Sequence, residues 1–396
     1  MNILSINTSE LGGGAANIAA TLSVAAPLYD SQAYFLVSEQ KTSASNVDQL
    51  PTSSWRKRWS QLRGSDLSGF LSAAIFAHPF YQQADIIHLH NLHGYYFDLT
   101  ILPRLCREKK VVWTFHDLWP LTASCSHTER WDLYCGLSLC HGRKLYPRFL
   151  CRRQKAIIDQ KLAIYQQSDF TIVAPCQWMD NKISQSALVS KKRSVIYNGI
   201  NHNLFAKQVN LELRKKLNLP QGRRLALFLA DGGSANRWKG WSYYQALRQR
   251  YGSDLFFISI GHHQADLLRN SDYWQLPYLS QAEVAEYLGA ADVFLFTSVA
   301  ENFPLVVLEA MASGLPVISF DVGGVSEVLA HRINGYLAES NSLSDFVSGI
   351  AWFLKLSPEE LGTIKQVNHD LIAKKFSGQL MSAEYYQLYQ QLLNQD

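Results

Sequence analysis

The sequence predicts an α/β protein made of two doubly wound domains, for three reasons. Short apolar, β-branched runs alternate with longer helical patterns over nearly the whole chain. Because these runs are apolar almost throughout, they are typical of parallel strands that helices cover on both faces. The alternation restarts after the polar stretch NLELRKKLNLPQGRR, and 396 residues are long for a single hydrophobic core.

The expected strands therefore form two groups, and we place the domain boundary between residues 205 and 206, just after VIYNGINHNLF. The loops that follow these strands are where a ligand is expected, because open α/β sheets bind ligands at the carboxyl ends of their strands. The first group is Ile3–Asn7, Ala33–Val37, Ile86–His90, Val111–Phe115, Phe170–Ala174 and Val195–Asn198, and the second is Leu225–Ala230, Leu255–Ile260, Val293–Phe296 and Pro316–Phe320.

Composition excludes several classes of protein. A hydrophobic fraction of 47% with 18% charged residues describes a globular chain. Lys+Arg 37 nearly balance Asp+Glu 33, so net charge indicates no nucleic-acid partner. Six cysteines in a chain of this size do not make a disulfide scaffold. We see neither a signal peptide nor a membrane-spanning run, and we expect a cytoplasmic protein.

The first strand leads into TSELGGGAANIAATL, in which Gly12, Gly13 and Gly14 precede a helical pattern. Consecutive glycines allow a tight turn and a close approach of the backbone to an anion at the helix N-terminus. A plain turn explains one glycine well and three poorly. A dinucleotide fingerprint would need a further glycine where Asn17 stands, so an NAD site, with Glu39 after the second strand, fits only in part.

His116 and Asp117 follow the strand in VVWTFHDLWP. An imidazole and a carboxylate at a strand's carboxyl end suit ligand binding and proton chemistry. A histidine that only caps or packs a loop explains the pattern equally well.

The segment CSHTERWDLYCGLSLCH holds Cys125, His127, Cys135, Cys140 and His141. Thiolate and imidazole are the usual ligands of zinc. The segment has no C-x-x-C pair and fits no common zinc spacing, so we favour buried or loop cysteines and predict no metal.

Two basic clusters with interleaved aromatics, WRKRWSQLR (Trp55–Arg63) and GRKLYPRFLCRRQK (Gly142–Lys155), are candidates for contact with an anionic membrane surface or a phosphate-bearing acceptor. The alternative is a solvated charged face.

In the second half, LFLADGGSANRWKGW follows a strand and places Arg237 and Lys239 among small residues, which suits a diphosphate. A surface loop with two cations is the alternative.

The stretch ENFPLVVLEAMASGLPVISF reads as a helix start followed by a strand. We expect Pro304 at the first helical position, with the amides of Leu305 and Val306 facing a phosphate. Glu301 lies just outside the helix, and Glu309, more than one turn inside it, is placed to accept hydrogen bonds from sugar hydroxyls. A glutamate on the helix dipole and a second, exposed one are the alternative.

Together these motifs resemble the retaining glycosyltransferases of family four, which have the GT-B fold of two doubly wound Rossmann-like domains facing across a deep cleft. The resemblance covers essentially the whole chain, and AADVFLFTSVAENFPLVVLEAMASGLPVIS is its most specific part. The segment TFHDLWP…RW…CG…C is similar to the branch of colanic acid and other exopolysaccharide assembly. The resemblance implies an acceptor domain over residues 1–205, a donor domain over 206–380 and a C-terminal helix, 381–396, returning to the first domain.

The resemblance also implies a hexosyltransferase that takes its sugar from a nucleotide-diphosphate-sugar donor and transfers it to a glycan or lipid-linked acceptor, without cofactor or bound metal. Transfer would proceed by front-side displacement, in which the leaving phosphate accepts the acceptor's proton. The roles it implies are ribose binding for Glu309, donor-sugar contact for Glu301, diphosphate binding for Lys239 and for the segment Asn302, Phe303, Pro304, Leu305 and Val306, approach to the phosphates and acceptor for Gly12–Gly14, and contact with the transferred sugar or acceptor for His116.

The sequence departs from the family pattern at the usual phosphate-binding arginine, where Ser234 stands, and we expect Arg237 to replace it. Cys176 stands for a usual serine, His262 and His263 occupy the usual G-D-G loop, and Glu129 stands roughly where a cysteine is expected. A catalytically degenerate partner subunit that binds a nucleotide or glycan is therefore an alternative function. An NAD-dependent enzyme is a weaker one, because it uses neither Glu301 nor Lys239.

Overall fold

The computed structural model describes residues 1–51, 72–128, 130–141, 153–206, 211–229, 232, 236–263 and 267–395. The chain divides into two compact units, Met1–Asn198 with Met381–Asp396, and Gly199–Leu380. The helix α7 (His202–Phe205) packs against α10 (Gln281–Ala290) and α11 (Leu305–Ala312), so residues 199–205 lie in the second unit although we had placed the boundary after residue 205.

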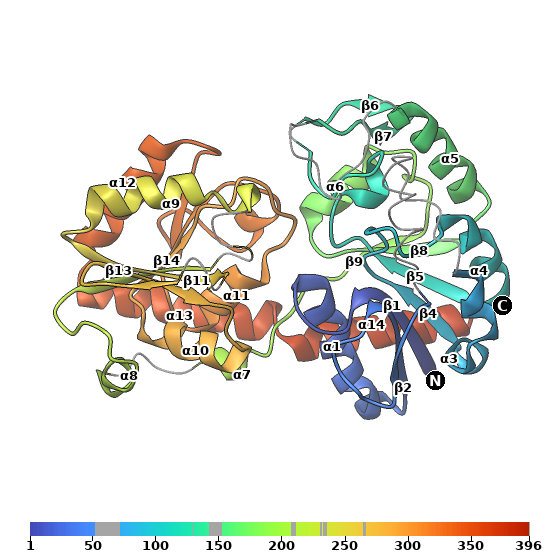
Figure 1. Ribbon diagram of the computed structural model, residues 1–396, viewed down its shortest axis with the longest axis horizontal. Coiled ribbons are helices and arrows are strands. Elements are labelled where there is room, and N and C mark those ends of the chain that lie inside the picture. Colours follow the sequence, from blue (N-terminus) through green and yellow to red (C-terminus); the bar gives the residue numbers. More distant parts are fainter. Residues whose placement is uncertain are drawn as a thin grey trace. The chain divides into compact units, whose positions relative to one another are not determined.

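The first unit is built on a parallel sheet in the order β3-β2-β1-β4-β5-β8-β9 (Figure 1). From β1 the chain adds β2 and β3 on one side, and β4, β5, β8 and β9 on the other. The carboxyl ends of β1 and β4 therefore form the switch point at which such sheets bind ligands. The strands are β1 Asn2–Ser9, β2 Gln32–Glu39, β3 Val47–Gln49, β4 Ile86–Leu89, β5 Lys110–Thr114, β8 Phe170–Ala174 and β9 Arg193–Val195.

Helices cover this sheet, and the last of them comes from the far end of the sequence. In α14 (Gly378–Leu393), Tyr386 stacks on Tyr29 with ring centroids 4.3 Å apart and donates its hydroxyl hydrogen bond to the carbonyl of Leu22, so α14 packs beside α1. The other helices are α1 Gly14–Ala25, α3 Pro79–Gln83, α4 Leu102–Glu108, α5 Gln154–Gln166 and α6 Gln177–Ser184, and a short hairpin joins β6 Leu133–Tyr134 to β7 Leu137–Ser138.

The second unit repeats the design with the strand order β12-β13-β11-β10-β14-β15-β16. All pairings are parallel except β12 with β13. Its switch point lies between β10 and β14. The strands are β10 Arg224–Leu229, β11 Leu255–His262, β12 Leu268–Arg269, β13 Tyr273–Pro277, β14 Val293–Phe296, β15 Val317–Phe320 and β16 Gly335–Ala338.

Helices lie on both faces of this second sheet. Figure 1 shows α9 and α12 on one side of it and α10 and α13 on the other. Ser280 and Glu283 form a capping box at the start of α10, and Ser357 and Glu360 do so at α13. The remaining helices are α8 Leu211–Lys216, α9 Trp241–Tyr251, α12 Leu343–Lys355 and α13 Pro358–Lys375.

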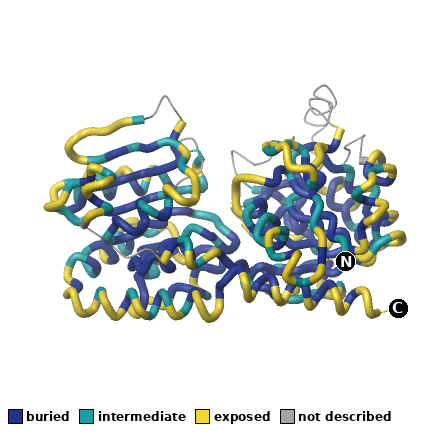
Figure 2. Tube along the Cα trace, turned by 90° about the horizontal axis from the view of Figure 1, so that it is seen from below, coloured by how far each residue is buried: buried dark blue, intermediate teal, exposed yellow. Residues whose placement is uncertain are grey.

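The central strands of each unit are buried, as the dark tube in Figure 2 shows, and every residue of β14 is buried. The predicted α/β class with two doubly wound domains is thus confirmed. The bounds of the expected strand Val195–Asn198 are wrong: β9, at the edge of the sheet, covers Arg193–Val195 and begins two residues earlier. The sequence did not suggest β3, β12, β13 or β16, which are short or lie toward the edges of the sheets.

Candidate active site

In the second unit, two glycine turns fix the loop between β14 and α11. Gly240 has φ +68°, and a Cβ added there would lie 1.8 Å from the carbonyl oxygen of Thr297. Gly323 has φ +58°, and its Cβ would lie 2.4 Å from the carbonyl oxygen of Glu301. Only glycine allows both turns to approach the loop this closely.

Backbone hydrogen bonds hold the same loop on both sides. The amide of Val299 donates to the carbonyl of Trp238 at 2.8 Å, and the amide of Gly324 donates to the carbonyl of Asn302 at 2.7 Å. Asn302 itself is buried. The loop that carries Glu301 is therefore rigidly tied to the turn that carries Lys239.

Lys239 and Glu301, which the sequence separates widely, form an ion pair of 2.6 Å between Nζ and Oε1. Their side chains are only 22% and 12% exposed, so water screens the pair weakly. Thr297 donates its hydroxyl hydrogen bond to the carbonyl of Lys239 at 3.0 Å, which fixes the backbone beneath the ammonium group. A cation and a carboxylate are thus held together at the switch point.

The helix α11 begins at Leu305, and Pro304 is its N-cap, with φ −77° and ψ 116°. Our expectation of Pro304 at the first helical position was therefore wrong by one residue: its ψ is extended rather than helical. The amides of Leu305 and Val306 belong to the first turn, where helix geometry provides no acceptor. This amide-rich end suits an anion whichever residue caps it.

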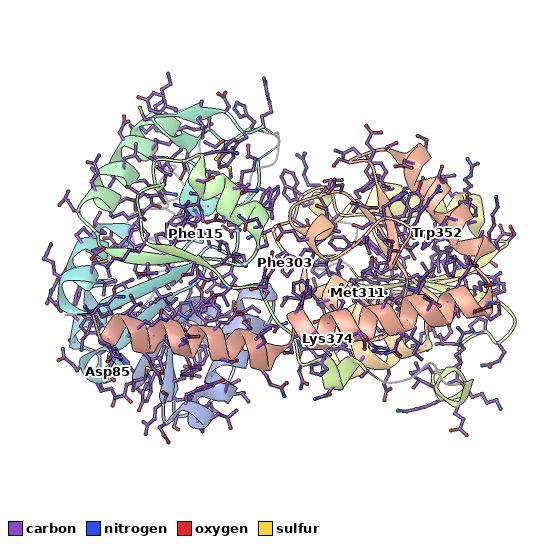
Figure 3. The ribbon with its side chains drawn as sticks, turned by 180° about the vertical axis from the view of Figure 1, so that it is seen from behind. Asp85, Phe115, Phe303, Met311, Trp352 and Lys374 are labelled. Atoms are coloured by element: carbon purple, nitrogen blue, oxygen red, sulfur yellow. A yellow bond between two sulfur atoms is a disulfide. The ribbon has the colours of Figure 1, made fainter. Side chains whose placement is uncertain are left out.

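The segment around α11 is otherwise apolar and packed. Phe303 and Met311 (Figure 3) are buried, and the ring of Phe303 lies 5.7 Å from that of Phe376 between centroids. Leu305 is also buried, whereas Pro304 and Val306 are partly exposed. The helix start is thus anchored from its apolar side.

Glu309 is a buried carboxyl group inside this apolar helix, with 6% of the residue exposed. Among the described residues, no hydrogen bond to its side chain is found. Burial raises the pKa of Glu309 to about 7, because the charged form is poorly solvated. The group therefore needs either a proton or a hydrogen-bonding ligand.

Arg237 lies in the turn that follows β10, two residues before Lys239. It is exposed, and its guanidinium lies 4.6 Å from the centroid of the Trp238 ring. Ser234 falls outside the described residues, so the replacement of the family arginine by Arg237 stays a prediction.

In the first unit, the glycine loop follows β1 at the switch point. Gly12 and Gly13 have φ of +84° and +82°, and Gly13 is the N-cap of α1, which begins at Gly14. All three glycines are exposed, and a Cβ on Gly13 or Gly14 would meet nothing within 4 Å. The positive φ values explain two of the glycines, and the open surroundings leave the backbone accessible to a ligand.

His116 and Asp117 follow β5 after the buried Phe115 (Figure 3), but they turn to different partners. His116 Nε2 lies 2.9 Å from His90 Nδ1, and burial lowers the pKa of His116 to about 4 despite the nearby Asp117. Asp117 Oδ2 lies 2.9 Å from His93 Nε2. Burial alone would raise the pKa of Asp117, but His93 and the amide of Trp119 lower it below its usual value.

The sequence reasoning missed His88, His90 and His93. They belong to HLHNLHG, the last residues of β4 and the loop that follows it, and all three are buried. The signal was available: three histidines in six residues, at the end of an apolar run beside the strand that leads into the glycine loop. Figure 1 shows β1 and β4 side by side.

The cysteine-rich segment is closed by a disulfide between Cys125 and Cys140. The amide of Ala123 donates to the carbonyl of Ser138 at 2.9 Å, which brings the two cysteine Cα atoms to 6.0 Å. Both cysteines are buried, as we expected for this segment, whereas their pairing in a disulfide was not predicted. Cys135 is an exposed thiol, and within the described ranges no group of three metal-ligating side chains is found.

The two basic-aromatic clusters fall largely outside the described residues. Trp55–Arg63 lies outside the described residues, as do residues 142–152 of Gly142–Lys155. None of the helices in the described ranges has the length and apolar character needed to cross a bilayer.

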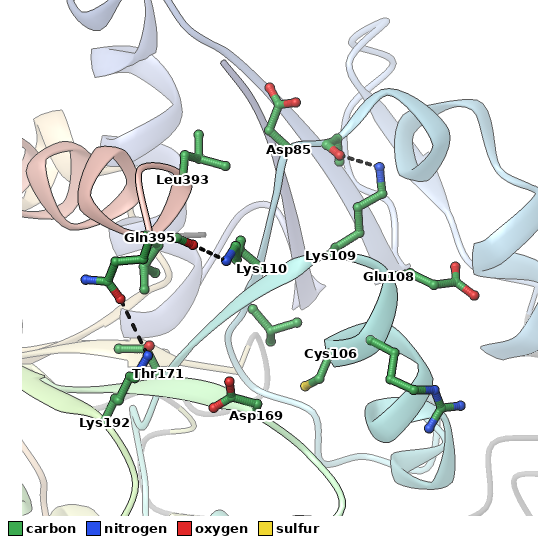
Figure 4. A pocket seen from close by; sticks show the side chains of 14 residues that line it. Asp85, Cys106, Glu108, Lys109, Lys110, Asp169, Thr171, Lys192, Leu393 and Gln395 are labelled. Atoms are coloured by element: carbon green, nitrogen blue, oxygen red, sulfur yellow. Dashed lines mark hydrogen bonds between the residues drawn. The ribbon is translucent and has the colours of Figure 1, made fainter.

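A cavity of about 560 Å³ lies at the amino-terminal ends of the strands of the first sheet (Figure 4). Lys110 begins β5 there, and Asp85 and Asp169 directly precede β4 and β8. Lys110 Nζ donates to the backbone carbonyl of Gln395 at 2.6 Å, and Lys192 Nζ to its side-chain oxygen at 3.5 Å. These are the amino ends of the strands, away from the switch point.

Comparison with known proteins finds glycosyltransferases over both units. The family description "Glycosyltransferase Family 4" matches residues 13–204, and "Glycosyl transferases group 1" matches residues 262–369. The chain is 24% identical over 328 residues to the putative colanic acid biosynthesis glycosyl transferase WcaC of Escherichia coli, which covers 78% of this chain and 76% of that protein. It is 25% identical over 240 residues to the N-acetyl-alpha-D-glucosaminyl L-malate synthase of Bacillus anthracis, covering 58% of this chain but only 62% of that protein.

Solved structures share the whole fold. Sucrose-phosphate synthase from Thermosynechococcus elongatus superposes with a TM-score of 0.75 at 17% identity over 100% of both chains. Anabaena HepE, in complex with UDP-glucose, gives a TM-score of 0.70 at 16% identity over 99% of this chain and 100% of that one. One glycosyltransferase description matches most of the first unit, the other lies within the second, and the fold is shared end to end. The chain is therefore a glycosyltransferase enzyme with the GT-B fold.

Proposed function

We propose that the protein is a retaining glycosyltransferase of polysaccharide biosynthesis, which moves a sugar from a nucleotide-diphosphate-sugar to a glycan or lipid-linked acceptor without a bound metal. The observation that carries this is the Lys239–Glu301 ion pair of 2.6 Å beside the start of α11, together with the buried carboxyl of Glu309. Relatives named for colanic acid and teichuronic acid biosynthesis support the setting, and a structural neighbour with UDP-glucose supports the donor class.

The donor's diphosphate binds at the start of α11. The amides of the first turn, at Leu305 and Val306, supply hydrogen bonds and the positive end of the helix dipole. Lys239 supplies the full positive charge, and Arg237 adds a second cation. Because the ammonium is already fixed by Glu301 and by its tied backbone, little reorganisation is needed when charge develops on the leaving diphosphate.

The ribose binds at Glu309. A buried carboxylate without a partner is costly, and two ribose hydroxyls can supply the hydrogen bonds that it lacks. Nucleotide binding thus converts an unfavourable buried charge into a satisfied one. Asn302, Phe303 and Pro304 form the part of the loop that joins Glu301, which contacts the donor sugar, to α11.

In the transfer step, the bond between the anomeric carbon and the diphosphate oxygen breaks while the acceptor oxygen bonds to the same face of that carbon. The acceptor's proton passes to the departing phosphate oxygen, so no side chain has to act as a base. Lys239 and the amides of α11 stabilise the negative charge on the leaving group. His116 contacts the sugar or the acceptor, and Gly12–Gly14 allow the backbone to approach the reacting groups.

The first experiment is a thermal-shift panel of uridine, guanosine and adenosine diphosphate sugars, because a ligand that binds only the folded state raises the melting temperature. Release of the nucleoside diphosphate is then measured with added glycan acceptors. No stabilisation by any of these nucleotide sugars would contradict the proposal. Stabilisation without any release would favour the degenerate partner subunit.

Lys239→Ala tests the site itself. We expect nucleoside diphosphate release to fall by at least about 100-fold, the size expected when one preorganised electrostatic contact to the transition state is lost. The matched control is Lys355→Ala, an exposed lysine of the same unit. Unchanged release in Lys239→Ala would place the diphosphate elsewhere.

The basic-aromatic clusters bring the enzyme to the inner face of the membrane in this proposal, near a lipid-linked acceptor. Sedimentation with anionic vesicles, compared with neutral ones, measures this contact. Equal sedimentation with both kinds of vesicle would remove the membrane part of the proposal and leave the transfer reaction untouched.

A further inference from the structure

The histidine that follows β4 is linked to the histidine that follows β5. His90 Nδ1 and His116 Nε2 lie 2.9 Å apart, and the two rings stack with an interplanar angle of 14°. His90 is 1% exposed, and its backbone carbonyl accepts a hydrogen bond from Trp113 Nε1 at 3.0 Å. His90 is therefore buried and held in place, whereas His116 is partly exposed.

His90 in turn rests on a fixed ring. His88 stacks against it with ring centroids 4.0 Å apart. His88 Nδ1 lies 2.7 Å from the hydroxyl oxygen of Tyr389 in α14, and His88 Nε2 lies 2.8 Å from Thr114 Oγ1. Both ring nitrogens of His88 are thus held, so His90 stacks on a ring of fixed orientation.

Both members of the pair are neutral near pH 7. Burial lowers the pKa of His116 to about 4, and burial together with the neighbouring histidines lowers that of His90 well below its usual value. Two neutral imidazoles that share one hydrogen bond hold a single proton between their facing nitrogens. Which nitrogen carries that proton decides the tautomer of both rings.

The far side of His90 decides between the two arrangements. His90 Nε2 is buried, and no described residue forms a hydrogen bond with it. If His116 Nε2 carried the shared proton, the proton of His90 would sit on Nε2 as a buried donor without an acceptor. If His90 Nδ1 carries it, only a lone pair is left unpaired at Nε2. Orphaned buried N–H groups are rarer than under-satisfied acceptors, so the second arrangement is favoured.

We propose that His90 is a positioning residue that donates its Nδ1 proton to His116 and thereby fixes His116 as the Nδ1–H tautomer, a hydrogen-bond donor toward a sugar or acceptor oxygen rather than a proton acceptor. This rests on the proposed function, in which His116 contacts the sugar or the acceptor. It agrees with a transfer step in which the leaving phosphate takes the proton, because a donating His116 stabilises an oxygen without removing a proton from it.

Nitrogen-15 NMR of the full-length chain, labelled on histidine and without ligand, tests the tautomer directly. We expect His116 to carry its proton on Nδ1, with Nε2 unprotonated. In His90→Leu this single tautomer should be lost, and in His90→Asn, whose amide nitrogen takes the place of Nδ1, it should return. An Nε2–H tautomer of His116 in the unaltered protein, or no change in His90→Leu, would overturn the inference.

Kinetics test the consequence, with the nucleotide sugar that raises the melting temperature most. We expect His90→Leu to lower kcat by at least about tenfold, by analogy with the lower end of the effect seen when the partner that orients a metal-ligating histidine is lost. The KM for the donor should stay unchanged, and His90→Asn should recover most of kcat. If His90 had only a structural role, kcat would fall by a similar factor in both variants. The control is Tyr81→Phe, which removes one hydrogen bond, to Glu108, from a buried residue of the same unit.

Failure of the proposed function and failure of the inference about His90 give different results. If no nucleotide sugar binds, the proposed function fails, while the NMR experiment still decides the tautomer. If the donor binds and turns over but His116→Ala leaves kcat unchanged, the inference fails and the proposed function stands.

Discussion

At the scale of single residues, the candidate site holds charged groups in surroundings that solvate them poorly. Glu309 is a carboxyl group in an apolar helix, and Lys239 and Glu301 form a largely desolvated ion pair. Buried ion pairs and unpartnered buried carboxyl groups contribute little to stability. Glu309 indicates function most directly, because burial raises its pKa and groups with a perturbed pKa cluster at functional sites.

Glu309→Gln should separate stability from function. The pKa of Glu309 is raised from 4.5 to about 7 in the folded state, so the folded protein binds more protons than the unfolded chain between these values and loses stability as the pH rises through them. Glutamine removes this loss. Relative to the unaltered protein, we therefore expect the free energy of unfolding of Glu309→Gln to be higher by up to about 3 kcal/mol at pH 8 and unchanged at pH 4. Donor affinity should fall, because the amide has one acceptor oxygen where the carboxylate has two, so it cannot offer a separate oxygen to each ribose hydroxyl.

Thermal unfolding of Glu309→Gln at pH 4 and pH 8, with nucleotide-sugar binding measured at pH 8, checks both halves. The exposed Glu339→Gln is the control and should change neither. A variant that binds the donor as well as the unaltered protein would show that Glu309 does not hold the ribose.

At the scale of elements, the turn after β10 and the loop after β14 work as one piece because a glycine lets them touch. Gly240→Ala should displace the loop that carries Glu301, since its Cβ would overlap the carbonyl of Thr297 and φ +68° disfavours alanine. We expect a loss of more than about 2 kcal/mol in stability and a large loss of transfer.

Gly362→Ala is the matched control, the same substitution in the same unit. Gly362 is exposed within α13, and its Cβ would meet nothing. It should stabilise the protein by about 0.5–1 kcal/mol through helix propensity and leave transfer unchanged. Chemical denaturation of the two variants measures these opposite signs, and similar values for both would show that the contact with Thr297 does not matter.

The disulfide acts at the same scale, on the segment that follows His116 and Asp117. Cys125 and Cys140 are separated by 15 residues, and such a closure stabilises by about 3 kcal/mol if it acts on the unfolded chain. Cys125→Ser should therefore lower the unfolding temperature of the first unit, whereas the exposed Cys135→Ser should not.

Peptide mapping without reductant identifies the link between Cys125 and Cys140. Recovery of both cysteines as alkylated thiols from the oxidised, denatured protein would contradict the pairing.

At the scale of the whole molecule, the residues proposed to bind the diphosphate and ribose lie in one compact unit, Gly199–Leu380, and only the approaching glycine loop Gly12–Gly14 belongs to the other. Units with separate cores need not unfold together. We therefore expect calorimetry to resolve two unfolding transitions. The nucleoside diphosphate, added alone, should raise the midpoint temperature of the second unit's transition and leave that of the first unit unchanged. Lys239→Ala should abolish that shift, and a shift confined to the first unit's transition would reverse the assignment.

Most of the fold was open to prediction. Fully buried parallel strands such as β10 and β14 carry their own apolar signal, and the start of α11 was located to within one residue. Edge strands were not predictable in the same way, because β3, β9 and β12 obtain their pairing from a neighbour rather than from a run of apolar residues. The individual candidates Lys239, Glu301, Glu309 and His116 were identified from motifs, whereas His90 was not.

The sequence alone determined the fold class, the loops where a ligand is expected and the residue types in them, because burial period and turn residues are local properties. Only the tertiary structure decided which of these residues meet. Lys239 reaches Glu301 through the contact of Gly240 with Thr297, His116 turns to His90 rather than to Asp117, and Cys125 pairs with Cys140. Such contacts join segments far apart in the chain, and the side chains that form them carry no local pattern that names the partner.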